Sequence, residues 1–313
     1  MAELGFPTLA NGSVLTLGTF DGVHLGHREI FKDLAARADR RRLPSVAVSF
    51  SPHPLAVLNP GAAPKLLTTP EERLVAIADG PAPSLAVIIP FSRDVAALTA
   101  EQFVTLLVER YRMCELVVGY DHGLGRGRQG DANVLRELGR TMDFTVDVVA
   151  AKVGVHGTAV SSTAIRRAVA YGDLEGASAL LGRRYSFLGR VSRGSSRGRS
   201  IGIPTINLAV APEKLLPPDG VYAVIVRSAR GSFGGMMNLG GRPTFGEVDR
   251  VPEVHMFGAS GEWYGQDVCV EFISRLRDTV RFAGLNELVQ QLTRDGEAAR
   301  KAVAFVDPSL SVD

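Results

Sequence analysis

The spacing of short apolar runs changes near residue 163, and this change limits the folds open to the chain. From residue 14 to about 151, runs rich in β-branched residues alternate with segments whose apolar residues recur at helical spacing. This alternation is typical of a parallel sheet with crossover helices. The expected strands are 14–17, 45–50, 85–91, 116–120 and 146–150, and two of the expected helices are 27–41 and 100–112. The first part of the chain is therefore predicted to be a doubly wound α/β domain.

After residue 163 the pattern becomes strand-rich. A helical segment at 164–181 leads into Gly- and Arg-rich sequence, and the runs that follow have no helices between them. The expected strands are 221–228, 234–239, 251–257 and 267–275, and a last helix is expected at 285–306. We predict a small antiparallel β-barrel domain with a C-terminal helix. A chain of 313 residues that is 45% hydrophobic can bury two such cores, so domains are expected at 1–182 and 183–313.

The composition limits the classes of partner that the chain is expected to bind. Thirty-five Lys and Arg face 33 Asp and Glu, and a net charge of +2 gives no argument for nucleic acid. Cys114 and Cys269 lie in separate apolar runs, which supports neither a disulfide framework nor a zinc site and favours a reducing cytoplasm. The N-terminus lacks a signal-peptide pattern, and no apolar run reaches membrane-spanning length. We expect a cytoplasmic protein without nucleic-acid or membrane partners, and the sequence indicates no particular protein partner.

A phosphate-binding pattern follows the first expected strand. His24, Gly26 and His27 fall where this strand turns into a helix. Backbone N–H groups and the helix dipole attract anions at such a turn, glycine allows close approach, and imidazoles donate to phosphoryl oxygens. A bare HxGH pattern can also be two incidental surface histidines. The position of this one favours a triphosphate site.

A second phosphate-type pattern occupies residues 160–166. Ser161, Ser162 and Thr163 would cap a helix beginning near Ala164, and Arg166 would lie in its first turn. An ordinary N-cap explains the serines alone. A helix start with an arginine in its first turn also suits a phosphate group.

These two elements resemble the HxGH and SSTxIR elements of the nucleotidylyltransferase superfamily, and further motifs narrow the resemblance. Residues 18–27 (GTFDGVHLGH), 50–54 (FSPHP), 90–91 with 99–103, and 118–121 (VGYD) are similar to the FMN adenylyltransferase module of bacterial bifunctional FAD synthetases. The resemblance implies a Rossmann-like domain that transfers AMP from ATP to FMN. It implies an ATP site made by Gly18, Thr19, Phe20, Asp21, His24, Gly26, His27, Ser161, Ser162, Thr163 and Arg166. It implies a flavin side made by Phe50, His53, Pro54 and Asp121.

One loop departs from the family pattern. His122 and Leu124 stand where the family usually has aromatic residues, which bears on flavin packing. In the same loop, Gly125, Gly127 and Gly130 imitate a dinucleotide fingerprint. Such a fingerprint belongs after the first strand of its unit, whereas this one follows a late strand.

A glycine-rich stretch opens the second domain. Residues 189–207 contain spaced glycines followed by Pro-Thr-x-Asn, and the stretch lacks the order of a Walker A loop. With residues 220–222, 238–245 and 253–255 it resembles riboflavin kinase from about residue 183 onward. The resemblance implies a kinase ATP site that contains Gly189, Val191, Gly194, Gly198, Gly202, Pro204, Thr205 and Asn207.

The same resemblance implies that Thr205 and Asn207 hold Mg²⁺ and that Glu253 accepts the proton of the ribityl 5′-hydroxyl. Glu247 and Asp249 are nearby alternatives, but only Glu253 lies in the family's Glu-x-His pattern. The catalytic residues expected from the whole chain are His24, His27 and Glu253.

The leading hypothesis is a two-domain enzyme that makes FMN from riboflavin and FAD from FMN, with ATP as co-substrate and Mg²⁺ as cofactor. Two other classes stay open at this point. HLGH also resembles an element of class I aminoacyl-tRNA synthetases, although residues 160–166 replace their lysine-rich partner loop. A flavin or nucleotide sensor without turnover would retain the same pockets.

Overall fold

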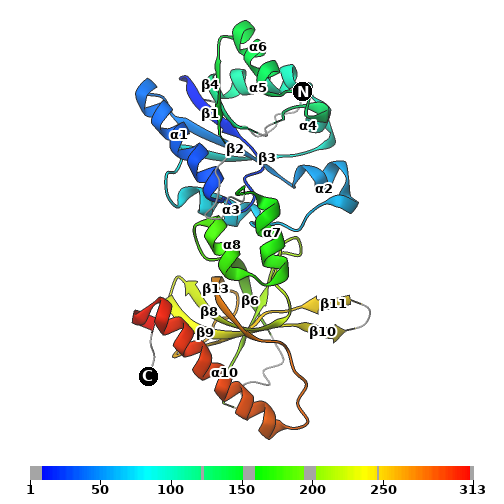
Figure 1. The fold of residues 1–313 in the computed structure, drawn as a ribbon, viewed down its shortest axis with the longest axis vertical. Helices are drawn as coiled ribbons and strands as arrows, with labels where there is room; N and C mark the ends of the chain where they lie inside the picture. Colours follow the sequence, from blue (N-terminus) through cyan, green and yellow to red (C-terminus); the bar gives the residue numbers. More distant parts are fainter. Residues whose placement is uncertain (1–8, 121–122, 151–158, 194–201, 245–246, 311–313) are drawn as a thin grey trace. The chain divides into compact units, whose positions relative to one another are not determined.

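The computed structural model describes residues 9–120, 123–150, 159–193, 202–244 and 247–310. By their contacts the residues group into two compact units, Met1–Ser162 and Thr163–Asp313 (Figure 1). The predicted domain boundary at 182/183 lies later in the chain, after helices α7 (Ser162–Tyr171) and α8 (Leu174–Leu181).

The first unit contains a five-stranded parallel sheet in the order β3-β2-β1-β4-β5. Its strands are β1 (Ser13–Leu17), β2 (Ser45–Ser51), β3 (Leu85–Pro90), β4 (Met113–Gly119) and β5 (Thr145–Val149). All five predicted strands are confirmed. The strand order reverses between β1 and β4, so the loops that follow these two strands meet at the topological switch point where doubly wound folds bind ligands.

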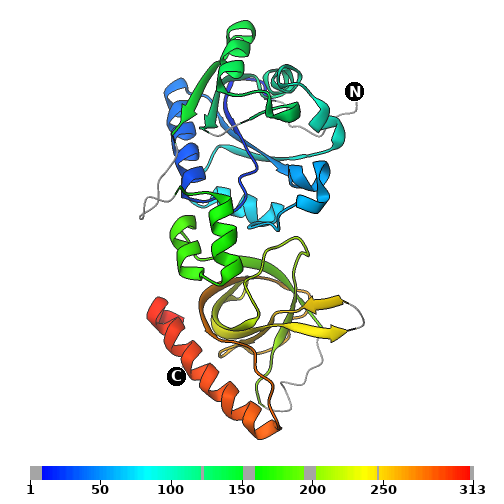
Figure 2. The ribbon, with the colours of Figure 1, turned by 45° about the vertical axis from the view of Figure 1, so that its right-hand side comes forward.

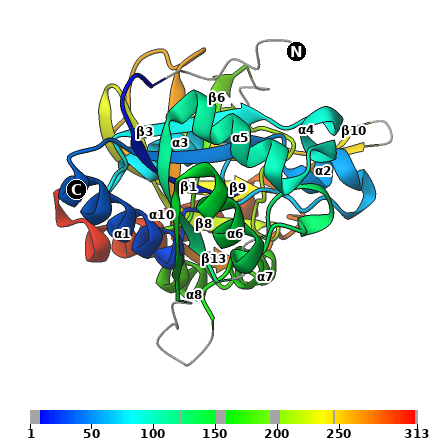
Figure 3. The ribbon, with the colours of Figure 1, turned by 90° about the horizontal axis from the view of Figure 1, so that it is seen from above.

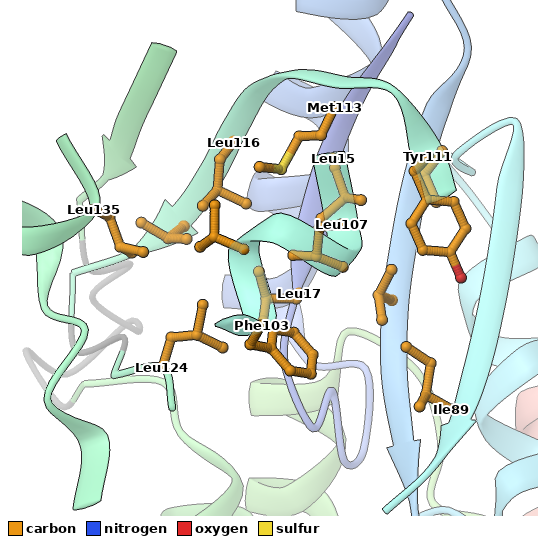
Figure 4. Packing of buried hydrophobic residues seen from close by; sticks show 14 of the residues in the cluster. Leu15, Leu17, Ile89, Phe103, Leu107, Tyr111, Met113, Leu116, Leu124 and Leu135 are labelled. Atoms are coloured by element: carbon orange, nitrogen blue, oxygen red, sulfur yellow. The ribbon is translucent and has the colours of Figure 1, made fainter. Parts of the chain in front are cut away.

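Helices cover both faces of this sheet (Figures 1 and 3). Val14 of β1 packs against Leu34 and Ala38 of α1 (Leu25–Arg41). Its neighbours Leu15 and Leu17 point the other way and join the cluster formed with α5 (Ala100–Tyr111), which Figure 4 shows from close by. Successive side chains of β1 point to opposite faces of the sheet. Because both faces are buried, apolar residues of this strand point in both directions.

Several helices of this unit lie outside the two that the sequence analysis named. They are α2 (Pro54–Leu58), α3 (Pro70–Ala78), α4 (Arg93–Ala97), α6 (Ala132–Met142) and the 3₁₀ turns η1 (Pro60–Ala62) and η2 (Arg126–Arg128). Helix α3 begins with a capping box in which Thr69 and Glu72 each accept from the other's backbone N–H, and Pro70 occupies its first turn.

The second unit is built on a closed barrel in the order β12-β7-β6-β13-β8-β9. Its strands are β6 (Ser186–Ser192), β7 (Ile206–Ala209), β8 (Gly220–Ser228), β9 (Gly231–Leu239), β12 (Glu253–Met256) and β13 (Asp267–Arg277). All its strand pairs are antiparallel, which confirms the predicted barrel. Strands β10 (Gly241–Thr244) and β11 (Glu247–Arg250) form a separate hairpin. Two barrel strands, β6 and β7, lie in sequence that the analysis described only as Gly- and Arg-rich.

Helix α10 (Leu285–Val306) lies along one side of the barrel, as Figure 2 shows, and its bounds agree with the prediction. Its buried Ala299 packs with Ala223, Met236 and Phe257 from the strands. The helical segment predicted at 164–181 is instead two helices. Gly172 has φ +80° between α7 and α8, and the Asp173 carboxylate caps α8 by accepting from Gly176 N at 2.8 Å.

Candidate active sites

The loop after β1 has an unusual backbone that its own side chains hold in place. Phe20 and Val23 have φ values of 45° and 41°, a region that L-residues rarely adopt. Both side chains are buried in a cluster with Phe31 and Ala76. Between them, the fully buried Asp21 carboxylate accepts hydrogen bonds from Leu67 N at 3.0 Å and Thr68 N at 2.9 Å. Strained backbone of this kind is typical of functional loops.

His24 and His27 form a reciprocal cap at the start of α1. The Nδ1 atom of each ring accepts from the other residue's backbone N–H at 3.3 Å. A neutral ring whose Nδ1 accepts carries its proton on Nε2, so both side chains have a donor at Nε2. The rings stack with centroids 3.5 Å apart. Two parallel imidazole donors at a helix N-terminus suit phosphoryl oxygens.

The cap leaves little room for a side chain at Gly26. A Cβ there would lie 3.2 Å from the His24 ring, which folds back over the first turn of α1. The sequence analysis attributed this glycine to the approach of a phosphate. The structure gives a second reason, because the imidazole ring of His24 lies close to this position.

The serines of the second pattern reach the same loop. Ser162 Oγ donates to Asp21 O at 2.9 Å. Helix α7 begins at Ser162, earlier than predicted, so this hydroxyl ties the segment to the loop after β1. Thr163 and Arg166 belong to the second compact unit, and their ATP contacts stay a prediction.

The residues expected on the flavin side have different surroundings. His53 caps α2, its Nδ1 accepting from Leu55 N at 3.2 Å, and Pro54 is the first residue of that helix. Phe50 is 8% exposed and packs against Phe91 and Phe103. Asp121 and His122 lie outside the described residues.

Two of the glycines after β4, Gly125 and Gly130, are explained by packing against the start of α5. A Cβ on Gly125, which has φ +74°, would lie 2.5 Å from Ala100 N, and one on Gly130 would lie 2.8 Å from Ala100 Cβ. Leu124, between β4 and these contacts, is 6% exposed and belongs to the core around Phe103 (Figure 4). The resemblance to a dinucleotide fingerprint therefore reflects a loop that packs on a helix start.

Arg73, which lies near the loop after β1, was not predicted as a site residue. Arg73 of α3 is 1% exposed, and its guanidinium donates to Ser49 Oγ at 2.9 Å and to Phe50 O at 2.8 Å. Burial lowers the pKa of this guanidinium, and the negative charges of Asp21 and Glu71 oppose that shift. An arginine in an acidic helix start gives no sign of burial in sequence.

In the second unit, polar side chains form a row across three strands of the barrel. Glu253 of β12 is in register with Asn207 of β7 on one side and with Asn238 of β9 on the other. Residues directly opposite each other in a sheet have neighbouring side chains on one face. The structure thus brings together the predicted base and one predicted Mg²⁺ ligand.

His255 ties this row to the Pro-Thr-x-Asn segment. Its Nδ1 lies 2.7 Å from Pro204 O, and because a carbonyl only accepts, Nδ1 carries the proton. This side-chain bond lies just beyond the last ladder pair of β12 with β7, which joins Val254 to Ile206. It fixes the segment that was predicted to hold Mg²⁺ relative to the strand that bears Glu253.

A cavity of about 550 Å³ opens beside this row, within the size range of small-molecule sites. Its polar lining is Thr205, Asn238, Glu253, His255, Arg277 and Thr279. Its apolar lining is Ile203, Val221, Met236, Val280, Phe282, Leu285, Leu288 and Leu292. One wall comes from the barrel strands and the other from α10 with the loop before it. A largely apolar cavity with a few polar groups in its lining suits a flat aromatic ligand that also carries polar groups.

Of the other residues predicted for the kinase ATP site, Gly189 and Val191 pack within the barrel, whereas Gly202 lies in open space. A Cβ on Gly189 would lie 3.1 Å from Leu208 Cβ, and Val191 is 3% exposed in the barrel. Gly202 has φ +74°, and beyond its chain neighbours no atom of the described residues lies within 4 Å of the place that a Cβ would take. Gly194 and Gly198 lie outside the described residues.

A buried ion pair fixes the helical wall of the cavity. Arg277, at the end of β13, donates from Nε and Nη2 to the Asp295 carboxylate of α10 at 2.9 and 2.6 Å. Asp295 also accepts from Gln291 Nε2 at 2.8 Å and is 4% exposed. The pair joins the strand end to the helix across the edge of the cavity.

Among the described residues, no group of three or more His, Cys, Asp or Glu side chains is arranged to hold a metal ion. Mg²⁺ that is bound with substrate phosphates needs only one or two protein oxygens, which Thr205 and Asn207 could supply. No helix in the described ranges has the length and apolar character needed to cross a membrane.

Two family models match the chain in succession. A model described as FAD synthetase matches residues 7–164, and one described as riboflavin kinase matches residues 181–303. The first match contains the HxGH pattern, and the second contains the row around Glu253.

Relatives match over nearly the whole chain. The bifunctional riboflavin kinase/FMN adenylyltransferase of Escherichia coli K12 is 36% identical over 301 residues, which cover 95% of both chains. The protein of the same name from Bacillus subtilis 168 is 32% identical and covers 92% of this chain and 91% of its own length. A solved structure described as a macrolide-efflux protein from Streptococcus pneumoniae has a TM-score of 0.83 at 32% identity, with 94% of this chain and 95% of that chain covered. The efflux role in that description is a statement about the pneumococcal protein.

Proposed function

The chain belongs to the family of bifunctional riboflavin kinase/FMN adenylyltransferases, and from this premise we propose which of its residues serve each reaction. The enzyme phosphorylates riboflavin to FMN and transfers AMP from ATP to FMN, with ATP as co-substrate of both steps. We assign adenylyl transfer to residues 1–182 and phosphorylation to residues 183–313. Because both reactions consume ATP, we also propose that the enzyme acts in the cytoplasm.

Adenylyl transfer is assigned to the loop after β1 and the start of α1. An oxygen of the FMN phosphate forms a bond to the α-phosphorus of ATP, and the bond to pyrophosphate breaks. The attacking phosphate is already an anion, so this site needs alignment and charge neutralisation rather than a base. The Nε2 donors of His24 and His27, with the N-terminus of α1, would stabilise charge on the phosphoryl oxygens.

The other predicted ligands would complete this site. Ser161, Ser162, Thr163 and Arg166 would contact the ATP phosphates from the second side, and His53, Pro54 and Asp121 would lie toward the flavin. Support for the first group comes from the bond between Ser162 Oγ and Asp21 O. Support for the second is the position of His53 and Pro54 directly after β2, beside the switch point.

Phosphorylation is assigned to the polar row of the barrel. The Glu253 carboxylate accepts the proton of the ribityl 5′-hydroxyl while that oxygen bonds to the γ-phosphorus of ATP, and ADP leaves. A primary alcohol needs such a base, unlike a phosphate. The register of Asn207, Glu253 and Asn238 beside the cavity carries this assignment. Mg²⁺ held by Thr205 and Asn207 would neutralise charge on the transferred phosphoryl group.

Two variants of the full chain separate the two sites. His27→Ala should lower FAD formation from supplied FMN about 100- to 1,000-fold and spare FMN formation from riboflavin. Glu253→Gln should do the reverse, with a loss of about 100- to 10,000-fold in FMN formation. Chromatography of riboflavin, FMN and FAD over time measures both. A variant that loses both activities equally, or neither, contradicts the assignment.

A further inference from the structure

Arg73 is the largest of the fully buried side chains in the described part of the chain, and it is charged. Arginine is seldom buried, because its desolvation is offset only by good hydrogen bonds. Its Nε has no hydrogen-bond partner among the described residues. Replacing a buried charged group by a well-packed apolar side chain of similar volume is often neutral or stabilising, so stability alone gives little reason for an arginine here. The contacts of this guanidinium therefore call for another explanation.

Those contacts join three separate segments at the carboxyl end of the sheet. Nη1 donates to Ser49 Oγ and Phe50 O at the end of β2, and Nη2 lies 3.4 Å from Thr68 O. The Ser49 hydroxyl in turn donates its only proton to Thr19 O at 2.9 Å. One side chain thus reaches the start of the flavin-side turn directly and the ATP loop through a single hydroxyl.

Thr68 closes the network on its other side. Its hydroxyl donates to Asp21 Oδ1 at 3.1 Å and accepts from Gly22 N at 2.9 Å. Its backbone oxygen faces Arg73, and its backbone N–H faces Asp21. A network of hydrogen bonds that includes the end of β2 therefore holds the loop that contains Phe20 and Val23.

We propose that Arg73 is a positioning residue for adenylyl transfer, which fixes the ATP loop and the flavin-side turn at one separation. The proposal rests on the proposed function of the first unit. In-line attack by the FMN phosphate on the α-phosphorus, with pyrophosphate leaving opposite, requires that separation to be held. A misplacement of about 1 Å can lower such a rate about 100-fold.

The experiment uses the full chain with Arg73→Met and Arg73→Lys. Methionine keeps much of the length without any donor, and lysine keeps the charge without the planar fork. The expected result is a kcat for FAD formation about 100-fold lower in Arg73→Met, with a much smaller change in the KM values for ATP and FMN. Arg73→Lys should recover part of that loss. FMN formation from riboflavin should be unchanged in both.

Arg37→Met is the matched control. Arg37 is half-buried and pairs with Asp33, Glu115 and Asp147, near the amino ends of β4 and β5. Its loss should lower stability without lowering kcat. Amide hydrogen exchange of β1 follows folding of the same unit in every variant.

Three results would overturn the inference. They are a wild-type kcat in Arg73→Met, an equal loss of kcat in Arg37→Met, and a loss of β1 protection that accounts for the fall in kcat. The assignment of the site itself fails separately, if His27→Ala keeps the wild-type rate of FAD formation.

Discussion

Replacing Asp295 by alanine tests how the cavity wall of the second unit is held. The side chain of Asp295 is 4% exposed and that of Arg277 is 20% exposed. The substitution leaves the guanidinium with one remaining bond, from Nη1 to Asp278 O at 2.8 Å. It also removes the acceptor of the Gln291 amide. Among the described residues, no other counter-charge then faces this half-buried cation across the joint between β13 and α10.

Breaking a buried pair from one side costs about 3 to 5 kcal/mol. The bond to Asp278 O and the partial exposure of Arg277 place the expected loss near the lower end, at about 3 kcal/mol. For a unit of this size that corresponds to a fall in Tm of roughly 6 to 12 °C. Replacing both partners, by Arg277→Met with Asp295→Leu, should recover most of the loss because no uncompensated charge is left.

The chain supplies a probe for this measurement. Its single tryptophan, Trp263, is 6% exposed and packs against Phe233 and Arg230, so tryptophan fluorescence during urea or thermal unfolding reports on the second unit alone. Asp267→Ala is the control, because its pair with Arg190 spans 4.0 Å between exposed side chains and should contribute less than about 1 kcal/mol. Equal effects of Asp295→Ala and Asp267→Ala, or a double variant less stable than Asp295→Ala, would refute the reasoning.

Two further predictions concern the cores. Phe272→Ala should destabilise the barrel by about 3 to 5 kcal/mol, because the ring is 1% exposed and packs between Phe187 and Tyr222, and Trp263 fluorescence in urea measures this. A loss below about 1 kcal/mol would contradict that packing. In the first unit, burial raises the pKa of Tyr111 to about 12, against about 10 in an unfolded chain. Its contribution to stability is therefore complete below pH about 10 and is lost as the pH rises toward 12, by roughly 3 kcal/mol in all. Hydrogen exchange of β1 should show this loss, and Tyr111→Phe should remove most of it.

The sequence predicted the fold where local patterns and tertiary packing agree. Strand β1 has an apolar run because both of its faces are covered, and α5 begins with the capping box that its sequence shows. The prediction missed β6 and β7, since glycines that allow close strand packing, such as Gly189, look like loop signals in a sequence. It joined α7 to α8 because the apolar spacing continues across Gly172.

The site was predictable only where its residues are contiguous. Residues 18–27 form a loop and a helix start, so a single pattern contains both the strained backbone and the histidine pair. Arg73 reaches the same loop through Ser49, which is far from both in sequence, and no spacing rule connects them. The cavity wall was missed for the same reason, because Arg277 and Asp295 meet only when α10 folds over the barrel.

The first site is held in its working geometry by the fold rather than by its ligands. Two residues at positive φ cost about 1 to 3 kcal/mol each. Burial of the Phe20 and Val23 side chains offsets this by about 1.5 to 3 kcal/mol each, and the bonds from Leu67 and Thr68 to the Asp21 carboxylate add to that. The strain is therefore balanced inside the hydrophobic cluster, before any phosphate binds. Charge that develops during adenylyl transfer then meets donors that need no reorganisation, which is the condition under which such donors contribute most to rate.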